Sequence, residues 1–340
     1  MNFKKYPSIE NSYRERFIEN VRVAGYANEN YHVQEKIHGA NLAIYCDGES
    51  IQFAAREHVI TGDEKFYGLN DISQELAIDA FNLWHIIKQY EAAEFVTGFI
   101  IYGELFGGMY PHSEVPKNND VIRVQKGVHY GPDTMFIAFD LYVTSQEPED
   151  LSEGSFINVS FANNLFDTVG ITRAETLHFG NLDSCLEYSS EFQTTIPSIS
   201  GLPEIEDNIC EGVVIKPDNS LYLNSGKRVV IKNKNERFSE KNRERKHKPT
   251  EPLSPITEAF VNTALSYVNE NRYNNVVSKM GEIDYDEPKN ISILIPALVK
   301  DVMEDFVKEN PDFTHLDKTE KKASQKAVTN AAKSLILKKF

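Results

Sequence analysis

Residues 35–41 read Glu-Lys-Ile-His-Gly-Ala-Asn, a cluster of polar side chains just before a hairpin signal. Apolar residues alternate or run through 41–46 and 50–55 on either side of Asp47-Gly48, a pair typical of a tight hairpin turn. Side chains at the entry to such a hairpin can line a cleft that is backed by a sheet. The stretch therefore predicts antiparallel β structure with polar groups gathered beside Lys36.

Strand signals continue through residue 235, with helices between them. The apolar runs 99–105 and 135–143 are typical of buried strands, and the spacing of apolar residues predicts a helix from Glu75 to Tyr90. Further signals predict a helix over 182–192 and short strands over 212–216, 220–223 and 228–232. Strands interrupted by occasional helices favour an α+β domain with antiparallel sheets.

The character of the chain changes after Asn235. Residues 236–255 are polar and basic and contain three prolines, which is typical of a linker. Helical periodicity then fills 256–269, 273–280, 291–307 and 318–338. The predicted organisation is an α+β domain over 1–235, a linker over 236–255 and a helical domain over 256–340.

Composition excludes several protein classes. With 41% hydrophobic and 26% charged residues, the 340-residue chain reads as a globular protein long enough for two domains. No apolar run approaches the ~20 residues of a membrane-spanning helix, and the first residues lack the apolar core of a signal peptide. Cys46, Cys185 and Cys210 are odd in number and form no C-x-x-C pair, so neither a disulfide framework nor a zinc site is expected. The simplest setting is reducing cytoplasm.

The charge of the chain is unevenly distributed. Net charge is −15, which argues at first against a nucleic-acid partner. Residues 1–226 hold 14 basic and 34 acidic side chains, whereas 227–248 hold 10 basic and 3 acidic ones. This basic segment is either a solvated linker or a surface that meets phosphates.

Nucleotide chemistry, if present, must use something other than a glycine-rich phosphate loop. Neither G-x-x-x-x-G-K-[ST] nor G-x-G-x-x-G occurs. Nucleophilic catalysis by lysine is the alternative. The pattern K-x-x-G occurs twice, at Lys36 and at Lys65, and only Lys36 has polar neighbours suited to the chemistry.

The stretch around Lys36 resembles motif I of the covalent nucleotidyltransferases, the ATP-dependent ligases and mRNA-capping enzymes. Residues 101–104, 138–140, 211–216 and 230–234 resemble their motifs III, IIIa, IV and V in the same order. The flanking text, including V-Q-K-G-V-H-Y and K-N-K-N-E-R-F-S-E-K, resembles the RNA ligase 2 family of bacteriophages, which is related to the trypanosome RNA-editing ligases. The resemblance implies a nucleotidyltransferase domain of ATP-grasp-like antiparallel sheets with flanking helices, followed by a small all-α C-terminal domain.

The resemblance also implies a covalent mechanism. Lys36 would attack ATP and carry AMP as a lysyl-adenylate. A lysine attacks phosphorus only as the neutral amine, and its ordinary pKa is roughly 10.4; Lys232 and Lys234 would favour the amine and grip the phosphates. Glu211 would help hold a divalent ion, Mg²⁺ with Mn²⁺ as the alternative.

Other matched positions receive roles by resemblance alone. Glu35 would recognise adenine, Glu104 would hold the ribose and Phe139 would stack on the base. The groups that would act on the phosphates and in the later steps are Arg56, His38 and Asn41.

For four matched positions, the role is not settled by the sequence. Lys216 either contacts the nucleotide or caps a strand before Pro217, and Asp140 matches a required position without a derivable role. Arg272 and Asp301 match tail positions of the family, although a helix–helix salt bridge explains them almost as well.

The implied function is joining of RNA 3′-OH and 5′-phosphate ends, at nicks in duplex RNA or at free ends, with ATP as the AMP donor. A monomer in the cytoplasm would suffice (host cytoplasm if the protein is phage-encoded), with no membrane partner. A DNA ligase is the first alternative, but the helical tail contrasts with the OB-fold expected there. A non-catalytic RNA-binding module is the second.

The tail itself would help dock RNA for AMP transfer. Its lysines form either a basic face for a duplex backbone or a solvated helix surface; they are Lys318, Lys321, Lys322, Lys326 and Lys333.

Overall fold

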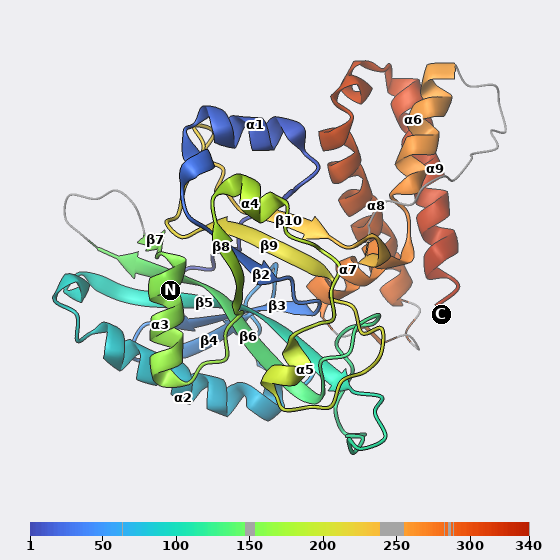
Figure 1. The fold of residues 1–340 in the computed structure, drawn as a ribbon. Helices are drawn as coiled ribbons and strands as arrows, with labels where there is room; N and C mark the ends of the chain where they lie inside the picture. Colours follow the sequence, from blue (N-terminus) through green and yellow to red (C-terminus); the bar gives the residue numbers. More distant parts are fainter. Residues whose placement is uncertain are drawn as a thin grey trace. The chain divides into compact units, whose positions relative to one another are not determined.

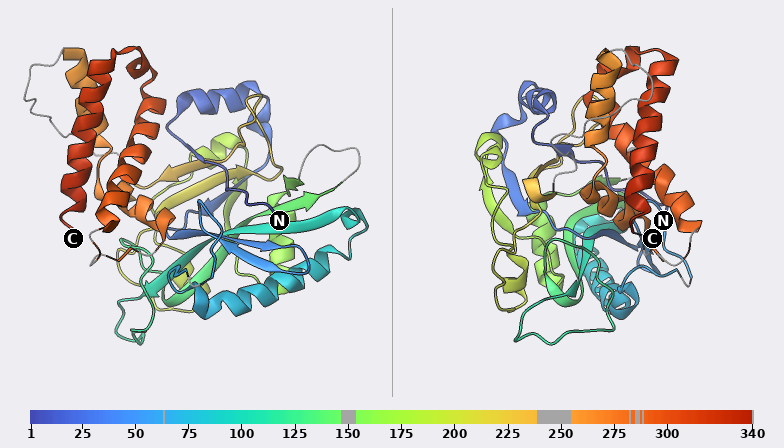
Figure 2. Two further views of the ribbon diagram at one scale, coloured as in Figure 1. Left: turned by 180° about the vertical axis from the view of Figure 1, so that it is seen from behind. Right: turned by 90° about the vertical axis from the view of Figure 1, so that its right-hand side faces the viewer.

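The computed structural model divides the chain into two compact units, Met1–Asn235 and Glu236–Phe340 (Figures 1 and 2). It describes residues 1–62, 64–146, 154–238, 255–281, 283–284, 287 and 289–339. Most of the predicted linker, and the part of the predicted basic segment that follows residue 238, therefore lie outside the described residues.

The first unit contains a five-stranded sheet with the order β1-β10-β9-β2-β8. Its strands are β1 (Glu10–Asn11), β10 (Ile231–Lys234), β9 (Gly212–Pro217), β2 (Tyr31–Glu35) and β8 (Thr176–Gly180). Only the β1–β10 pair is parallel among these neighbours. Helices α1 (Glu15–Val23) and α4 (Leu182–Leu186) lie over this sheet in Figure 1. Phe17 and Val21 of α1 pack with Val33 and Val213 in one buried cluster, because apolar residues face inward on both layers.

A second five-stranded sheet has the order β4-β3-β5-β6-β7 and is antiparallel throughout. Its strands are β4 (Ile51–Ala54), β3 (Ala40–Cys46), β5 (Val96–Met109), β6 (Gly131–Ser145) and β7 (Gly154–Phe156). Helices α2 (Leu69–Ile87) and α3 (Val159–Val169) cover one face, where Leu76 and Leu83 meet strand residues such as Ile101. The other face carries Tyr6, Tyr45 and Tyr102 in a separate aromatic cluster.

The described part of the second unit is helical. It contains α6 (Pro255–Ser266), α7 (Glu270–Met280), α8 (Lys289–Glu309) and α9 (Lys318–Ile336), which lie against one another in Figure 2. Val268, Leu298, Phe306 and Val328 are buried in its own core. Short 3₁₀ turns at Glu236–Phe238 (η3) and Pro311–His315 (η4) complete it; two more in the first unit span Tyr26–Asn28 (η1) and Glu91–Ala93 (η2).

The predicted α+β class with antiparallel-rich sheets and a helical C-terminal part is confirmed. The hairpin around Asp47-Gly48, the helix over 75–90 and the long strands are present, and β5 and β6 extend beyond the predicted ends. Helices α1 and α3 and strands β1, β2, β7 and β8 were not predicted. No described helix combines the length and apolar character that crossing a bilayer requires.

Two predicted elements are wrong. The helix over 182–192 ends at Leu186, because the Ser189 hydroxyl accepts a hydrogen bond from Glu191 N (3.2 Å) and donates one to Glu191 O (3.1 Å), a local turn that competes with helix. The strand over 220–223 is reduced to one bridge between Tyr222 and Arg228, which flank a tight turn. A remaining short helix, α5 (Ile196–Ile199), was also unpredicted.

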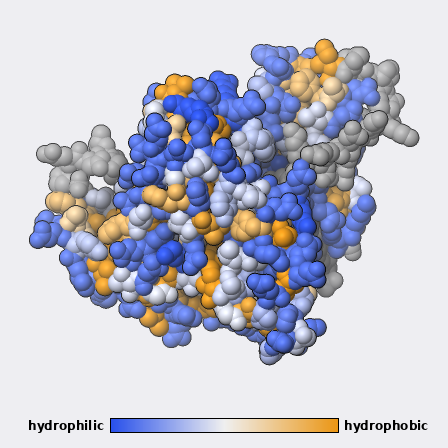
Figure 3. Space-filling view, viewed as in Figure 1, coloured by the Kyte–Doolittle hydropathy of each residue, from blue (hydrophilic) through white to orange (hydrophobic). Residues whose placement is uncertain are grey.

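The surface is mixed in character. On the face shown in Figure 3, hydrophobic residues are scattered in small groups among hydrophilic ones, which is ordinary for a protein surface.

Candidate active site

Lys36 directly follows β2 at the edge of a charged cluster. Its Nζ lies 2.7 Å from Glu211 Oε2, and Lys234 Nζ lies 2.9 Å from Glu211 Oε1. His38 Nδ1 approaches Glu211 Oε2 at 3.4 Å. These groups meet because β9 lies between β2 and β10, and Glu211 immediately precedes β9.

Backbone contacts hold Lys36 and Glu211 close together. Lys36 N donates to Gly212 O at 2.8 Å, which continues the β2–β9 pairing into the site. Gly212 has a φ of +141°, and a Cβ there would lie 2.1 Å from Asn233 O on β10. Strands β9 and β10 can therefore approach this closely only with glycine at this position.

Glu211 is ionised in this cluster. Burial alone would raise its pKa, but Lys234, Lys36 and His38 hold the pKa of this carboxyl well below its ordinary value. From the sequence we expected Lys232 and Lys234 to supply a positive field around Lys36 and Glu211 to hold a divalent ion. The structure instead places a carboxylate against its amine, so Lys36 is held as one member of an ion pair.

Glu104 lies on β5 opposite Asn41 of β3, near the same cluster. Burial raises the pKa of Glu104 to about 7; Lys36 and Arg56 lower it and Glu211 raises it further. Asn41 Nδ2 donates to Gly103 O (3.3 Å), and burial lowers the pKa of the half-buried Arg56. Lys232 and Lys234 are two residues apart on β10, so their side chains share one face of the sheet.

The raised pKa of Glu104 predicts a pH-dependent stability. Between pH 4.5 and 7 the folded protein keeps a proton that the unfolded chain has lost, so stability falls as pH rises through this window. Glu104→Gln should remove the penalty and stabilise the protein at pH 8 on the order of 2 kcal/mol, with less gain at pH 5.5. Thermal melts at both pH values measure this, with the exposed Glu114→Gln as control. An equal gain at both pH values would contradict the assignment.

Glu35 points to the neighbouring α5 region. Its carboxylate accepts hydrogen bonds from Thr194 Oγ1 (2.5 Å), Thr195 N (2.8 Å) and Thr195 Oγ1 (2.8 Å). Burial raises the pKa of Glu35 and these donors partly offset the rise. The predicted role in adenine recognition stays a prediction, and it would have to use the remaining acceptor capacity of this carboxylate.

Phe139 lies at an irregularity of the second sheet. Tyr102 of β5 pairs with Asp140 and Gly103 pairs with Ala138, so Phe139 is an extra residue in a β-bulge. Its carbonyl accepts a hydrogen bond from the buried Lys216 Nζ. Burial lowers the pKa of Lys216 to about 8, against the opposing effect of Asp140. Lys216 thus does more than cap a strand: it ties β9 of one sheet to the bulge of the other.

Asp140 anchors the other side of the bulge. It accepts hydrogen bonds from Tyr6 OH (2.8 Å) and from Arg228 Nη1 and Nη2 (2.5 and 3.2 Å). Burial would raise its pKa, but Arg228 and Lys216 keep the pKa of Asp140 below its ordinary value. The Tyr6 ring also packs edge-on against Phe139, with ring centroids 5.1 Å apart. Asp140 therefore positions Phe139, a role that the sequence alone did not reveal.

Tyr6 and Arg228 hold Asp140 in place, and the sequence did not single them out. Neither stands at a spacing that carries a chemical signal. Their contacts with Asp140 span 134 and 88 residues of sequence.

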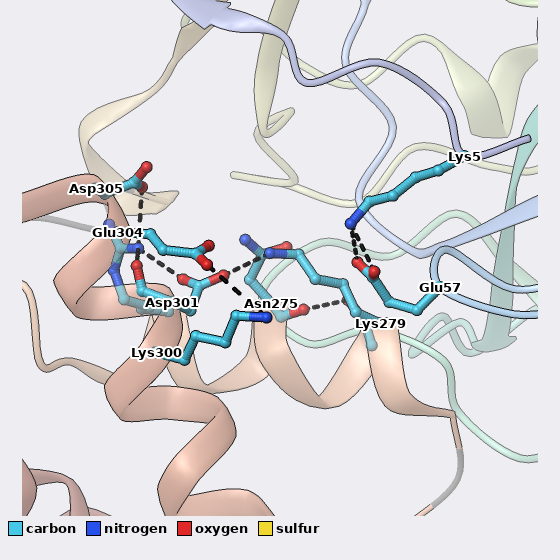
Figure 4. A network of polar contacts seen from close by, with 10 residues as sticks. Lys5, Glu57, Asn275, Lys279, Lys300, Asp301, Glu304 and Asp305 are labelled. Atoms are coloured by element: carbon cyan, nitrogen blue, oxygen red, sulfur yellow. Dashed lines mark hydrogen bonds and ion pairs between the residues drawn. The ribbon is translucent and has the colours of Figure 1, made fainter. Parts of the chain in front are cut away.

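Arg272 and Asp301 lie in the helical unit. Arg272 Nη1 is 2.6 Å from Asp301 Oδ2 and 3.0 Å from Asp305 Oδ2. Lys279 Nζ is 2.7 Å from Asp301 Oδ1 (Figure 4). The helix–helix salt bridge between α7 and α8 is present, and a role in RNA docking stays a prediction.

Residues 29–234 match the family described as RNA ligase, and residues 252–334 match the one described as T4 RNA ligase 2 C-terminal. The chain belongs to the RNA ligase family. It is an ATP-dependent RNA ligase, with RNA and ATP as substrates, so the DNA-ligase and non-catalytic alternatives are set aside.

Two mitochondrial proteins of Trypanosoma brucei brucei are similar to this RNA ligase. RNA-editing ligase 1 is 27% identical over 364 residues, covering 91% of this chain and 76% of that protein. RNA-editing ligase 2 is 28% identical over 356 residues, covering 90% and 83%. Among solved structures, an apo mutant of Naegleria gruberi RNA ligase superposes with a TM-score of 0.46 at 12% identity. That superposition covers 69% of this chain and 57% of the Naegleria chain.

Proposed function

We propose that this RNA ligase seals nicks in duplex RNA through a lysyl-AMP on Lys36 and an adenylated RNA 5′ end. The observation that carries the proposal is the Lys36–Glu211–Lys234 cluster. It places the amines of Lys36 and Lys234 within hydrogen-bond distance of one buried carboxylate, where β2, β9 and β10 lie side by side. We further propose that one copy of the chain suffices, since all these groups come from a single chain, and that the enzyme works in the cytoplasm.

In each of the three steps, one bond to phosphorus forms while another bond to the same phosphorus breaks. Lys36 Nζ, as the neutral amine, forms a bond to the α-phosphorus of ATP as the bond to pyrophosphate breaks. An RNA 5′-phosphate oxygen then takes the AMP, and the Lys36–phosphorus bond breaks. Finally an RNA 3′-OH attacks the adenylated 5′-phosphate and releases AMP. Lys232 and Lys234 would offset the negative charge that develops on the phosphates.

The site fits a divalent ion held largely by phosphates and water. Glu211 is ionised and buried, while the described residues contain no group of three or more His, Cys, Asp or Glu side chains placed for a metal. Mg²⁺ characteristically uses one or two carboxylates together with substrate phosphates and waters. When bound at Glu211, such an ion would supply charge neutralisation at the α-phosphate.

The nick preference can be measured on a gel with matched substrates. We expect a nicked RNA duplex to be sealed at least about tenfold faster than the same nick with DNA on the 3′-OH side, because DNA lacks the 2′-hydroxyls that a protein can bind. Single-stranded RNA with the same ends should also be joined more slowly. Equal rates on all three substrates would refute the preference while leaving the ligase activity intact.

A further inference from the structure

Helix α9 presents a row of lysines on one exposed face. Lys318, Lys322, Lys326 and Lys333 are all exposed. At about 100° per residue they fall within an arc of roughly 80°, and from first to last they span about 22 Å along the axis. We call these four residues the lysine face. Lys321, one of the five lysines singled out in the sequence, is not part of it, because its Nζ donates to Thr314 O at 2.7 Å.

The lysine face differs from four other lysines of the helical unit in its pairing. Those four contact carboxylates: Lys279 with Asp301, Lys289 with Glu287, Lys300 with Glu304 and Lys339 with Glu270. Within the described part of the chain, no member of the lysine face forms an ion pair or a side-chain hydrogen bond. No carboxylate among the residues that the structure describes therefore neutralises its positive charge.

No carboxylate of α9 shares this face. The helix contains one acidic residue, Glu320, which accepts a hydrogen bond from Thr257 Oγ1 (2.6 Å) and closes the capping box with Asp317. Between the lysines, the outward positions carry neutral polar side chains, Gln325, Thr329 and Asn330. The Thr329 hydroxyl donates to Gln325 O (2.8 Å), whereas the side-chain amides of Gln325 and Asn330 can donate hydrogen bonds to phosphate or ribose oxygens.

Like charges four residues apart repel each other on a helix, and Lys318/Lys322 and Lys322/Lys326 are two such pairs. The face thus weakens the isolated helix, and no acidic side chain of α9 lies on that face to offset the repulsion. A polyanion would offset it, because each phosphate contact releases a condensed counterion.

We propose that the lysine face binds the phosphate backbone of the substrate RNA. The proposal rests on the RNA-joining function and adds a second contact surface, made of residues that take no part in AMP transfer to Lys36. A row of cations about four residues apart suits a repeating backbone better than a single terminal phosphate.

The test is the salt dependence of RNA binding by the full-length enzyme. The probe is a labelled nicked RNA duplex whose 3′ end at the nick lacks the 3′-OH, so that it binds without being sealed. Replacing all four lysines by glutamine should reduce the slope of log K against log salt by up to about 3.6, which corresponds to four phosphate contacts. Glutamine is a good helix former, so α9 should stay folded, and labelling of Lys36 by ATP should be unchanged.

Two companion variants make the result specific. Lys289, Lys300, Lys308 and Lys338 replaced together by glutamine change the net charge equally and should leave the slope within one unit of the unaltered enzyme. Arginine at the four positions of the lysine face should restore the slope, because it keeps the charge. An unchanged slope in the first variant, or an equal loss in the control, would overturn the proposal. If the unaltered enzyme is labelled by ATP but does not bind RNA at all, the proposed function fails as well.

Discussion

Lys36→Ala should abolish transfer of AMP from ATP to the protein. No other nucleophile lies at this position, and the amine is the atom to which AMP would be bonded. Incubation with ATP labelled at the α-phosphate, followed by denaturing electrophoresis, measures the covalent product directly. We expect a loss of at least about a thousandfold, the scale seen when a covalent nucleophile is removed.

The matched controls separate chemistry from charge. Lys36→Arg keeps the positive charge beside Glu211 but cannot lose its proton at usable pH, so it should also remain unlabelled. Lys65→Ala alters the second K-x-x-G lysine and should label normally. Labelling that persists in either Lys36 variant would refute the covalent mechanism.

Asp140→Ala should produce the second large effect, on stability and on nucleotide binding together. The change leaves the Arg228 guanidinium buried without its partner, and breaking a buried ion pair in this way costs about 3–5 kcal/mol. It also removes the hydrogen bond from Tyr6 that anchors the bulge at Phe139. We expect a markedly lower melting temperature and, in the protein that remains folded, a raised KM for ATP in the labelling reaction.

An exposed ion pair provides the comparison. Asp167 and Arg173 lie 2.8 Å apart on the surface, and Asp167→Ala should cost about 1 kcal/mol or less. Asp140→Asn keeps a hydrogen-bond acceptor for Tyr6 while removing the charge, so it should fall between the two. If Asp140→Ala melts like Asp167→Ala, or if its KM for ATP is unchanged, Asp140 does not have the positioning role described here.

The parts of the site that could be predicted are those encoded in short stretches. Lys36, Glu211 and Lys234 each lie in a local motif, and the order of those motifs matched a known enzyme class. The anchor at Asp140 could not be predicted, because Tyr6 and Arg228 reach it only through the tertiary fold. Periodicity likewise cannot reveal the bulge at Phe139, since one extra residue in a long apolar strand leaves the hydrophobic pattern almost intact.

For secondary structure, too, the elements that could be predicted are those with strong local signals. The long helices and the hairpin at Asp47-Gly48 have strong local signals, whereas α4 ends early because of a hydroxyl contact at Ser189 that competes with the helix. The ion pair between Lys36 and Glu211 was also unforeseen: the spacing of the motifs indicates which residues matter, but not which charges touch.

Gly212 has a consequence for how the site could fail. Side chains on a strand alternate between faces, so a shift of β10 by one residue relative to β9 would turn Lys232 and Lys234 away from Glu211 together. The close approach of the two strands at Gly212 disfavours such a slip. After the shift, a residue with a side chain would take the place of Gly212 opposite β10, and its Cβ would clash with the backbone there. Gly212 thus helps to fix the register between β9 and β10. The placement of the two lysines beside Glu211 depends on that register.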